Sequence, residues 1–403
     1  MAILRRMILN ASAKISAFLV FTGFGLCTAS AVELSGYVGA EYRYFQHDAL
    51  FSSAGQHHSS IALAPEFYTE WDDGEQSLLF SPFLRLDGED AERTHADIRE
   101  LQWLLVRDDW ELRVGVGKVF WGVAESQHLV DVINQTDLVE NTDTEDKLGQ
   151  PMINLSLFQD WGTVDLFVMP YFRERTFAGR DGRLRGPLVV DTDAATYESG
   201  AGRHHLDVAV RWSHSISDWD LGVSHFYGTN REPQLLVNST ATALIPFYET
   251  MHQTGLDAQY TRESWLCKLE MIRRETAAST FFALTGGVEY TFYSVFDSDI
   301  DVGLISEYLF DDRDDASSTA SEDDVLVGTR LTWNDVQSSE LLVGVIHDLS
   351  SEDMAWNIEA SRRIGDRWKL SVEGRFFNVN TVPSVLYTVR RDDYIQLELA
   401  RYF

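Results

Sequence analysis

The side chains in this sequence that could do chemistry are charged groups rather than catalytic ones. The histidines include the pairs His57-His58 and His204-His205, but neither a Gly-x-Ser-x-Gly nucleophile elbow nor a zinc-binding His-Glu-x-x-His pattern is present. Two cysteines cannot build a disulfide framework or a cysteine-rich metal site. The sequence therefore predicts no enzyme, no metal and no cofactor, and the charges are what must be explained.

A run of carboxylates lies between Val123 and Gln150, with Lys147 as its one basic residue. Closely spaced carboxylates attract cations, so the chemistry they offer is electrostatic selection of a charged solute. The alternatives are that they bind divalent ions or stay solvated. The carboxylates are Glu125, Asp131, Asp137, Glu140, Asp143, Glu145 and Asp146.

The overall composition excludes several classes of protein. With 33 basic and 63 acidic side chains, the formal net charge is -30, and such a chain has no basic face for nucleic acid. Its hydrophobic fraction of 44% and aromatic fraction of 12% argue against disorder. The chain folds around or against something apolar.

The first 31 residues form a predicted targeting segment. Arg5, Arg6 and Lys14 accompany the short apolar stretch 15–26, and Ala29-Ser30-Ala31 is a small-residue cleavage pattern. We expect residues 1–31 to be a cleaved secretory signal peptide. Residues 32–403 would then form one domain.

The rest of the chain alternates apolar and polar side chains in segments of about ten residues. In one example Val208 and Val210 alternate with Asp207 and Arg211. Such alternation predicts strands with one apolar face. A soluble sandwich could show the same pattern, so alternation alone does not identify the solvent.

The positions of the tryptophans predict that the solvent around the apolar face is lipid. Seven of the 11 tryptophans lie beside the short turns that alternate with longer polar connections, and Phe296 takes that place at one further turn. An aromatic girdle at one end of a closed sheet is typical of a transmembrane β-barrel. The predicted girdle is Trp71, Trp110, Trp161, Trp219, Trp265, Trp333 and Trp368.

Counting the alternating segments predicts an all-β, up-and-down antiparallel barrel of 18 strands, with 16 as the alternative. Closure supplies every backbone polar group in the bilayer with a partner. The expected strands span 33–45, 58–71, 76–87, 97–107, 110–121, 151–159, 162–173, 204–215, 219–228, 248–262, 265–275, 280–295, 299–310, 324–334, 340–349, 354–364, 367–378 and 391–403.

If the apolar register faces lipid, the other register lines the lumen. Both signs of charge occur there in similar number, and a barrel of about 18 strands is wide enough to hold water. The alternative is an internal salt-bridge network that leaves little opening. The predicted pore-wall residues are Glu66, Glu70, Arg85, Glu100, Glu111, Arg113, Arg211, Lys268, Arg330 and Arg375.

The last strand, 394–403, resembles the C-terminal assembly signal of Gram-negative outer-membrane barrels. Ile395, Leu397 and Leu399 alternate toward the terminal Phe403, whereas Arg401 stands where the family usually has an apolar or aromatic residue. The resemblance implies an outer-membrane location and recognition of Phe403 by the barrel assembly machinery.

A second resemblance is to porin-like barrels. It rests on Gly117-Lys118-Val119-Phe120-Trp121-Gly122, followed by Asn134 and Asp137. In general porins the third outer loop enters the bore and sets acidic groups against basic wall residues. The resemblance implies that Glu125, Asp131, Asp137 and Glu140 constrict the lumen opposite Arg85 and Arg113.

We therefore predict a channel for passive diffusion of small hydrophilic solutes or ions. A substrate-specific channel for an oligosaccharide, carboxylate or hydrophobic compound is the first alternative, and a barrel lipase or protease is the second. Expected contacts are membrane lipid and lipopolysaccharide, for which the basic cluster Arg173 to Arg185 is one candidate. Wide barrels occur as monomers and as homotrimers.

Overall fold

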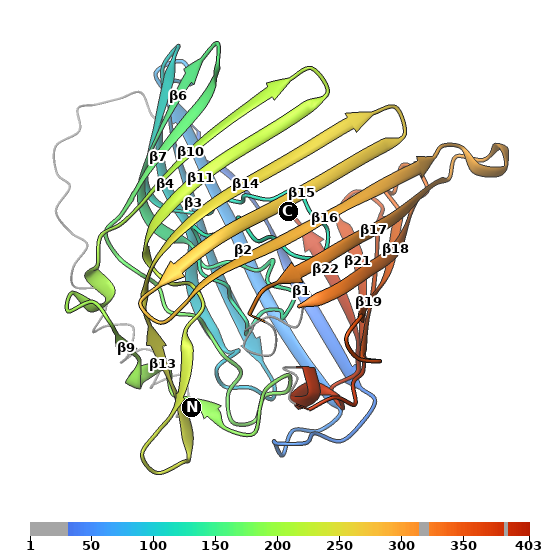
Figure 1. Cartoon of the computed structure of the whole chain (residues 1–403). Coiled ribbons are helices and arrows are strands. Elements are labelled where there is room, and N and C mark those ends of the chain that lie inside the picture. The colour runs from blue at the N-terminus through green and yellow to red at the C-terminus, as the bar shows by residue number, and fades with distance from the viewer. Residues whose placement is uncertain (1–30, 314–321, 383–385) are drawn as a thin grey trace.

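The protein is a closed barrel of 18 antiparallel strands, seen in a computed structural model that describes residues 31–313, 322–382 and 386–403 (Figure 1). The predicted count of 18 is confirmed, and the alternative of 16 is not. The barrel strands are β1 (Glu33–Phe45), β2 (His57–Trp71), β3 (Gln76–Asp87), β4 (His95–Val106), β5 (Trp110–Gly117), β6 (Gln150–Gln159), β7 (Gly162–Met169), β10 (Asp207–Ile216), β11 (Trp219–Thr229), β14 (Thr250–Arg262), β15 (Trp265–Thr276), β16 (Thr280–Phe292), β17 (Asp301–Asp311), β18 (Asp323–Thr332), β19 (Glu340–Asp348), β20 (Met354–Ile364), β21 (Trp368–Asn378) and β22 (Tyr394–Tyr402).

Each strand pairs with its neighbours in the chain, and β22 pairs with β1 to close the sheet. Two pairings skip short elements, because β7 pairs with β10 and β11 pairs with β14. Most strand bounds agree with prediction to within a few residues. The largest differences are at β5 and β7, which end at Gly117 and Met169 rather than at 121 and 173.

The two faces of the wall follow the alternation of the sequence. On β10 the side chains of Val208 and Val210 are exposed on the outside, whereas those of Asp207 and Ala209 are buried inside. A strand places successive side chains on opposite faces, so one register faces the outside of the barrel and the other the lumen.

All seven predicted girdle tryptophans lie at one end of the barrel, at or next to strand termini beside short turns. Trp161, Trp219, Trp265 and Trp368 are exposed on the outer surface. Trp219 and Trp265 contact Tyr260 and Tyr290 on the adjacent strands. Their contact with a membrane interface stays a prediction.

The C-terminal strand closes the wall beside this aromatic end. The Phe403 N–H donates to the Gly36 carbonyl at 3.0 Å, which ties the chain end to β1. Arg401 faces outward and its guanidinium lies 5.8 Å from the centre of the Trp368 ring. An arginine here can keep its charge at the interface while its stem covers the aromatic ring, which accounts for its presence on the apolar register.

A small accessory sheet lies at the end of the barrel opposite the short turns (Figure 1). It comprises β8 (Val189–Val190), β9 (Thr196–Tyr197), β12 (Gln234–Val237) and β13 (Ala243–Tyr248). The sequence analysis did not predict it, because β12 lacks alternation and β13 contains Pro246. Short 3₁₀ turns are η1 (Thr192–Ala194), η2 (Gly202–His204), η3 (Val295–Asp297) and η5 (Leu386–Val389).

Over the ranges that the structure describes, no helix has both the length and the apolar character needed to cross a bilayer. The predicted signal peptide lies outside the described residues, apart from Ala31, and stays a prediction.

Candidate functional site

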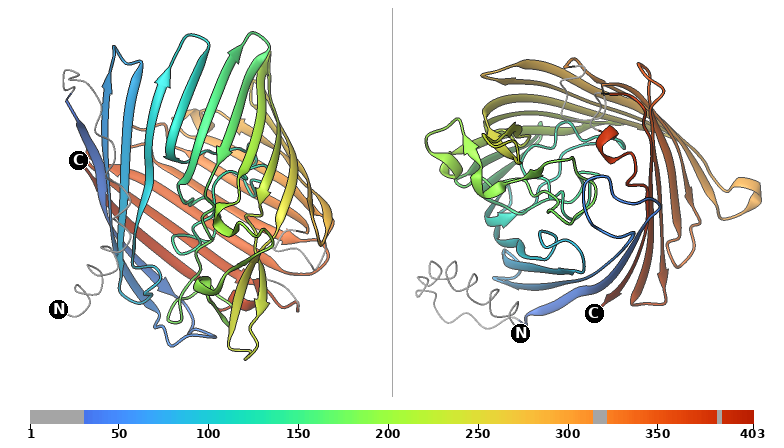
Figure 2. Two further views of the ribbon diagram at one scale, coloured as in Figure 1. Left: turned by 90° about the vertical axis from the view of Figure 1, so that its left-hand side faces the viewer. Right: turned by 90° about the horizontal axis from the view of Figure 1, so that it is seen from below.

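The connection between β5 and β6, residues 118–149, turns into the barrel (Figure 2). β5 is only eight residues long, so the chain leaves the wall at Gly117, well inside the rim. Val130, Ile133 and Asp137 are 0% exposed. We call residues 118–149 the inner loop.

Asn134 ties the two ends of the inner loop together. Its side-chain oxygen accepts a hydrogen bond from the Val119 N–H at 2.8 Å, and its amide donates to the carbonyls of Gly117 and Leu148 at 2.9 and 2.8 Å. A buried amide with satisfied partners holds its surroundings in one arrangement. In the sequence Asn134 is only part of a motif, and the structure gives it this positioning role.

One side of the inner loop packs against the wall as an apolar core around Trp121, Val130 and Ile133. This cluster occupies the lumen beside β6 to β16. The sequence could have predicted this cluster, because lumen-facing positions such as Phe167 and Met169 are apolar. A water-filled bore requires polar residues at such positions. The wall residues of the cluster are Met152, Phe167, Met169, Ala209, Phe226, Met251, Ile272, Phe281 and Ala283.

Two wall carboxylates hold the inner loop by its backbone. Glu270 on β15 and Glu307 on β17 are 0% and 2% exposed, and each accepts three hydrogen bonds from the loop at 2.6–3.2 Å. Bonds to an ionised acceptor are the stronger kind. The donors are the N–H groups of Val123, Ala124 and Val130 for Glu270, and those of Glu125 and Ser126 with the Ser126 hydroxyl for Glu307.

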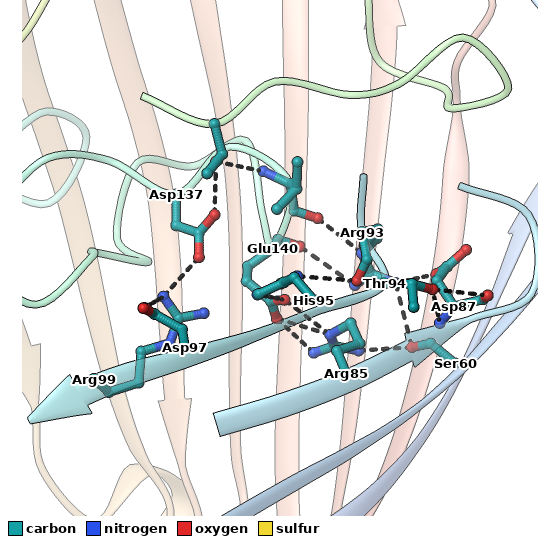
Figure 3. A network of polar contacts seen from close by, with 12 residues as sticks. Ser60, Arg85, Asp87, Arg93, Thr94, His95, Asp97, Arg99, Asp137 and Glu140 are labelled. Carbon is teal, nitrogen blue, oxygen red and sulfur yellow. Dashed lines mark hydrogen bonds and ion pairs between the residues drawn. The ribbon is translucent and has the colours of Figure 1, made fainter. Parts of the chain in front are cut away.

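On the opposite wall the inner loop joins a network of arginines from β3 and from the connection between β3 and β4 (Figure 3). The Glu140 carboxylate lies 2.7 Å from Arg85, and Arg85 also bonds Glu41 at 3.0 Å. Arg93 bonds the same Glu41 at 2.8 Å and Asp87 at 2.9 Å. Because every arginine here is paired with carboxylates, the network serves to brace the loop.

Asp131 and Asp137 do not line the lumen as expected. Asp137 pairs with Arg99 at 2.6 Å, and Asp131 pairs with Lys147 of the same loop at 3.0 Å. Both carboxylate side chains are 0% exposed. Both carboxylates form internal ion pairs, so they stabilise the fold of the inner loop and do not face a solute.

Glu125 faces two of the predicted wall cations. Its carboxylate lies 2.7 Å from Arg330 and 3.4 Å from Lys268. Farther along the loop, Asp143 lies 3.2 Å from Arg375. The structure thus brings predicted loop acids and predicted wall bases together at Arg85, Lys268, Arg330 and Arg375.

Arg113 differs from the expectation that it opposes the inner loop. Its guanidinium pairs with Glu111 on the same strand and bonds Asn154 on β6. Arg211 likewise stays on the wall, with two bonds of 2.7 and 2.8 Å to Asp257. Of the remaining predicted wall acids, Glu70 accepts a bond from Tyr68, whereas Glu66 and Glu100 border the main cavity.

Arg99 is absent from the predicted wall because of an irregularity in β4. The register of β3 with β4 shifts between Ser81 and Pro82, so that Ser81 opposes Glu100 while Pro82 opposes Ile98. A β-bulge inserts one extra residue and re-aims the side chains around it. Consequently Arg99 and Glu100, neighbours in sequence, both face the lumen, which strict alternation forbids.

A cavity of about 880 Å³ lies beside the inner loop, bounded by β1 to β4 and β18 to β22. Twelve carboxylates and five cationic side chains line it. The sequence analysis expected both signs in similar number along the whole wall. Around this cavity, where the inner loop adds five acids and Lys118, acidic side chains predominate. The acids are Glu41, Glu66, Glu100, Glu125, Glu140, Asp143, Glu145, Asp146, Glu340, Glu359, Glu373 and Glu398, and the bases are Arg85, Arg99, Lys118, Arg330 and Lys369.

Two loop acids in this cavity titrate near neutral pH. Burial, partly offset by Arg375, raises the pKa of Asp143 to about 6. Burial, together with the nearby charges of Asp143 and Glu140, raises the pKa of Asp146 to about 6. Burial also raises the pKa of Glu145. The charge of the lumen beside the inner loop therefore depends on pH.

The basic cluster Arg173 to Arg185, the candidate for a lipopolysaccharide contact, is partly internal. Arg183 bonds Asp392 of the last connection at 2.7 Å, and its side chain is 2% exposed. Arg173 bonds Asp97 on β4 at 2.7 Å. These arginines fix the long connection after β7 over the barrel mouth.

His95, Asp137 and Glu140 offer ligand atoms within 4.8 Å of one another, a spacing that could hold a metal ion. However, Asp137 is bonded to Arg99 and Glu140 to Arg85. Guanidinium groups this close oppose a divalent cation. The group therefore belongs to the bracing network.

No family model and no curated protein matches the chain. Among solved structures, mutants of the porin from Rhodopseudomonas blastica match at 14% sequence identity and a TM-score of 0.45, over 93% of this chain and 100% of theirs. A structure described as "Asymmetric conductivity of engineered proteins" matches with the same values. The similarity concerns the fold alone. The chain is a closed 18-stranded antiparallel barrel, consistent with the porin-type barrel that the sequence predicts.

Proposed function

We propose that the protein is an outer-membrane channel for passive diffusion of small hydrophilic solutes, and that it prefers cations. The observation that carries this proposal is the cavity beside the inner loop, where twelve carboxylates face five cationic side chains. An excess of fixed negative charge in a confined space concentrates cations and repels anions.

The inner loop supplies the constriction in this proposal. It is fixed on one side by its apolar core and by Glu270 and Glu307, and on the other by its pairs with Arg85 and Arg375. With half of the lumen packed, the passage follows the acidic wall formed by β18 to β22 and β1 to β3. Glu125 and Glu140 border this passage, with Asp143, Glu145 and Asp146 beside them.

The surroundings of the barrel follow from the same proposal. The tryptophan end would lie at the periplasmic interface of a Gram-negative outer membrane, and the accessory sheet would lie outside the cell among lipopolysaccharide. The barrel assembly machinery would recognise the strand that ends at Phe403. A homotrimer is the assembly we propose to test first, and we propose no catalytic activity.

Planar-bilayer recording of the refolded barrel in a potassium chloride gradient tests the channel. We expect stable conductance steps and a reversal potential whose sign reports cation preference. Anion preference would overturn the proposed selectivity. A correctly folded barrel that inserts but never conducts, at any voltage, would overturn the channel itself.

A further inference from the structure

Two prolines face each other across the ladder between β2 and β3. The pairing is continuous up to Leu63 on β2 and resumes at Phe67, which places Pro65 opposite Pro82. Alternate pairs in an antiparallel ladder exchange two N–H···O bonds, and proline has no N–H to donate. The ladder is therefore interrupted over residues 64–66 and 81–83, which we call the seam.

The neighbouring strands are irregular at the same level. Gly36 on β1 pairs with Pro65 and has φ +138°, and a side chain there would come within 2.3 Å of the Ala64 carbonyl. On the other side of the seam, the β3–β4 register shifts between Ser81 and Pro82. Pairing is thus irregular between β2 and β3 and between β3 and β4, while β1 keeps its register with β2 and is irregular only in the backbone conformation of Gly36.

The seam lies in the middle of the lipid-facing band. Pro65 is in the same outward register as Leu63 and Phe67, which are exposed on the outer surface. It is six residues from Trp71, or about 20 Å along the strand, and barrel strands are tilted by about 40°. That places it about 15 Å from the tryptophan end, near the centre of an apolar band about 25 Å tall.

The lumen side of the seam carries two acidic groups, Glu66 and Glu100, of which Glu100 accepts a backbone hydrogen bond from Lys118. Glu66, Ser81 and Glu100 come from three adjacent strands and all line the main cavity, with Ser81 directly opposite Glu100. Within the described part of the chain, the buried Ser81 hydroxyl oxygen has no hydrogen-bond partner, and Glu66 forms no hydrogen bond or ion pair. The interrupted stretch of the ladder thus has two acidic side chains on its lumen side, of which Glu66 has no protein partner among the described residues.

We propose that the seam admits the alkyl chain of an amphipathic organic cation between β2 and β3, while its ammonium group binds Glu66 and Glu100 in the lumen. The ladder is interrupted between Leu63 and Phe67, which lie about 13 Å apart along the strand. Strands about 4.8 Å apart leave no room between their backbones, so β2 and β3 must part to admit an alkyl chain, and at the Pro65–Pro82 pair no N–H···O bond resists this. A charged head in the bilayer centre is stable only with a partner of opposite sign, and the two glutamates supply it. The wall then gives a lateral entry from the membrane into the lumen, beyond the diffusion path along the barrel axis.

Photochemical labelling of the barrel in lipid vesicles tests the proposal. The probe is a dodecyltrimethylammonium with a diazirine in mid-chain, and adducts are mapped by mass spectrometry. We expect adducts concentrated at residues 63–67 and 80–84. Replacing both prolines, P65V/P82V, restores two ladder N–H groups and should lower this labelling about tenfold, which corresponds to about 1.4 kcal/mol of binding free energy. The variant P65A/P82A makes the same test with smaller side chains.

The control variant is P151V, because Pro151 is the second residue of β6 and its pairing with Val116 is intact. Labelling in P151V should equal that of the unaltered barrel, with heat-modifiable migration confirming that every variant is folded. E66Q/E100Q should lower labelling by the cationic probe and leave labelling by an uncharged dodecanol diazirine unchanged. Adducts spread evenly around the wall, or seam labelling that survives P65V/P82V, would overturn the proposal. The readout needs no conductance, so a barrel that never conducts would contradict the proposed channel and leave this test standing.

Discussion

Arg85 on β3 and Glu140 in the inner loop join inside the barrel at 2.7 Å, with side chains that are 9% and 5% exposed. The pair links a wall strand to a loop 55 residues farther along the chain. Because both groups are withdrawn from water, removing either one leaves the other as a buried charge with one partner fewer. The pair therefore couples the position of the inner loop to the stability of the barrel.

The variant E140Q should destabilise the folded barrel. Breaking a buried pair by removing one partner costs about 3–5 kcal/mol, and the lower end applies because Arg85 keeps Glu41. The free energy of unfolding in lipid vesicles, measured by urea titration of tryptophan fluorescence, should fall by about 3 kcal/mol. E92Q changes an exposed acid in the nearby β3–β4 connection and should have little effect. Equal losses in the two variants would refute a bracing role for Glu140.

The variant E270A should loosen the inner loop. It removes the acceptor of three loop N–H groups, and each buried donor left without a partner costs about 1–3 kcal/mol. We expect a noisier open-channel current and a higher mean conductance, because the freed loop no longer keeps to the apolar side of the lumen. E270Q retains one acceptor oxygen and should give a smaller change.

E275A is the matched control for E270A. Glu275 lies on the same strand, β15, but is half exposed and pairs with Arg273 on the outer surface. Its current should match that of the unaltered barrel. If E270A also conducts as steadily as the unaltered barrel, Glu270 does not hold the loop.

The strands were predictable because their signal is local. Alternation as in Asp207 to Arg211 indicates which side chains of a strand face outward and which face the lumen. A tryptophan beside a short turn indicates where one end of the strand lies. Neither feature depends on a contact with a distant residue. The accessory strand β12 has neither feature, and it was missed.

The contacts of the candidate site were predictable only in part, because they depend on where the inner loop lies. The resemblance to porin-like barrels implied that Glu140 and Arg85 are opposed charges. It could not separate the buried Asp137 from the cavity-lining Asp143, since both are aspartates in one acidic run. Arg99 was lost for a different reason, because one extra residue in β4 breaks the period of two on which the inward assignment relied.

The double variant D143N/D146N should weaken cation preference. It removes two cavity-lining charges from the inner loop. The ratio of cation to anion permeability, taken from reversal potentials, should fall about twofold or more. D72N/D73N removes two exposed charges from a short turn at the tryptophan end and should leave the ratio nearly unchanged. A similar fall in both variants would show that the net charge of the protein, rather than the loop, sets the preference.

Cation preference should also depend on pH, with a midpoint near 6. The pKa values of Asp143 and Asp146 are raised to about 6, so both groups are ionised above that pH and lose their charge as the pH falls through it. The preference for cations should therefore be full at about pH 8 and decline between about pH 7 and pH 5. In D143N/D146N this decline should be absent. Ordinary carboxylates titrate near pH 4. A single midpoint near 4 in the unaltered barrel would mean that these two acids are solvated and do not border a confined passage.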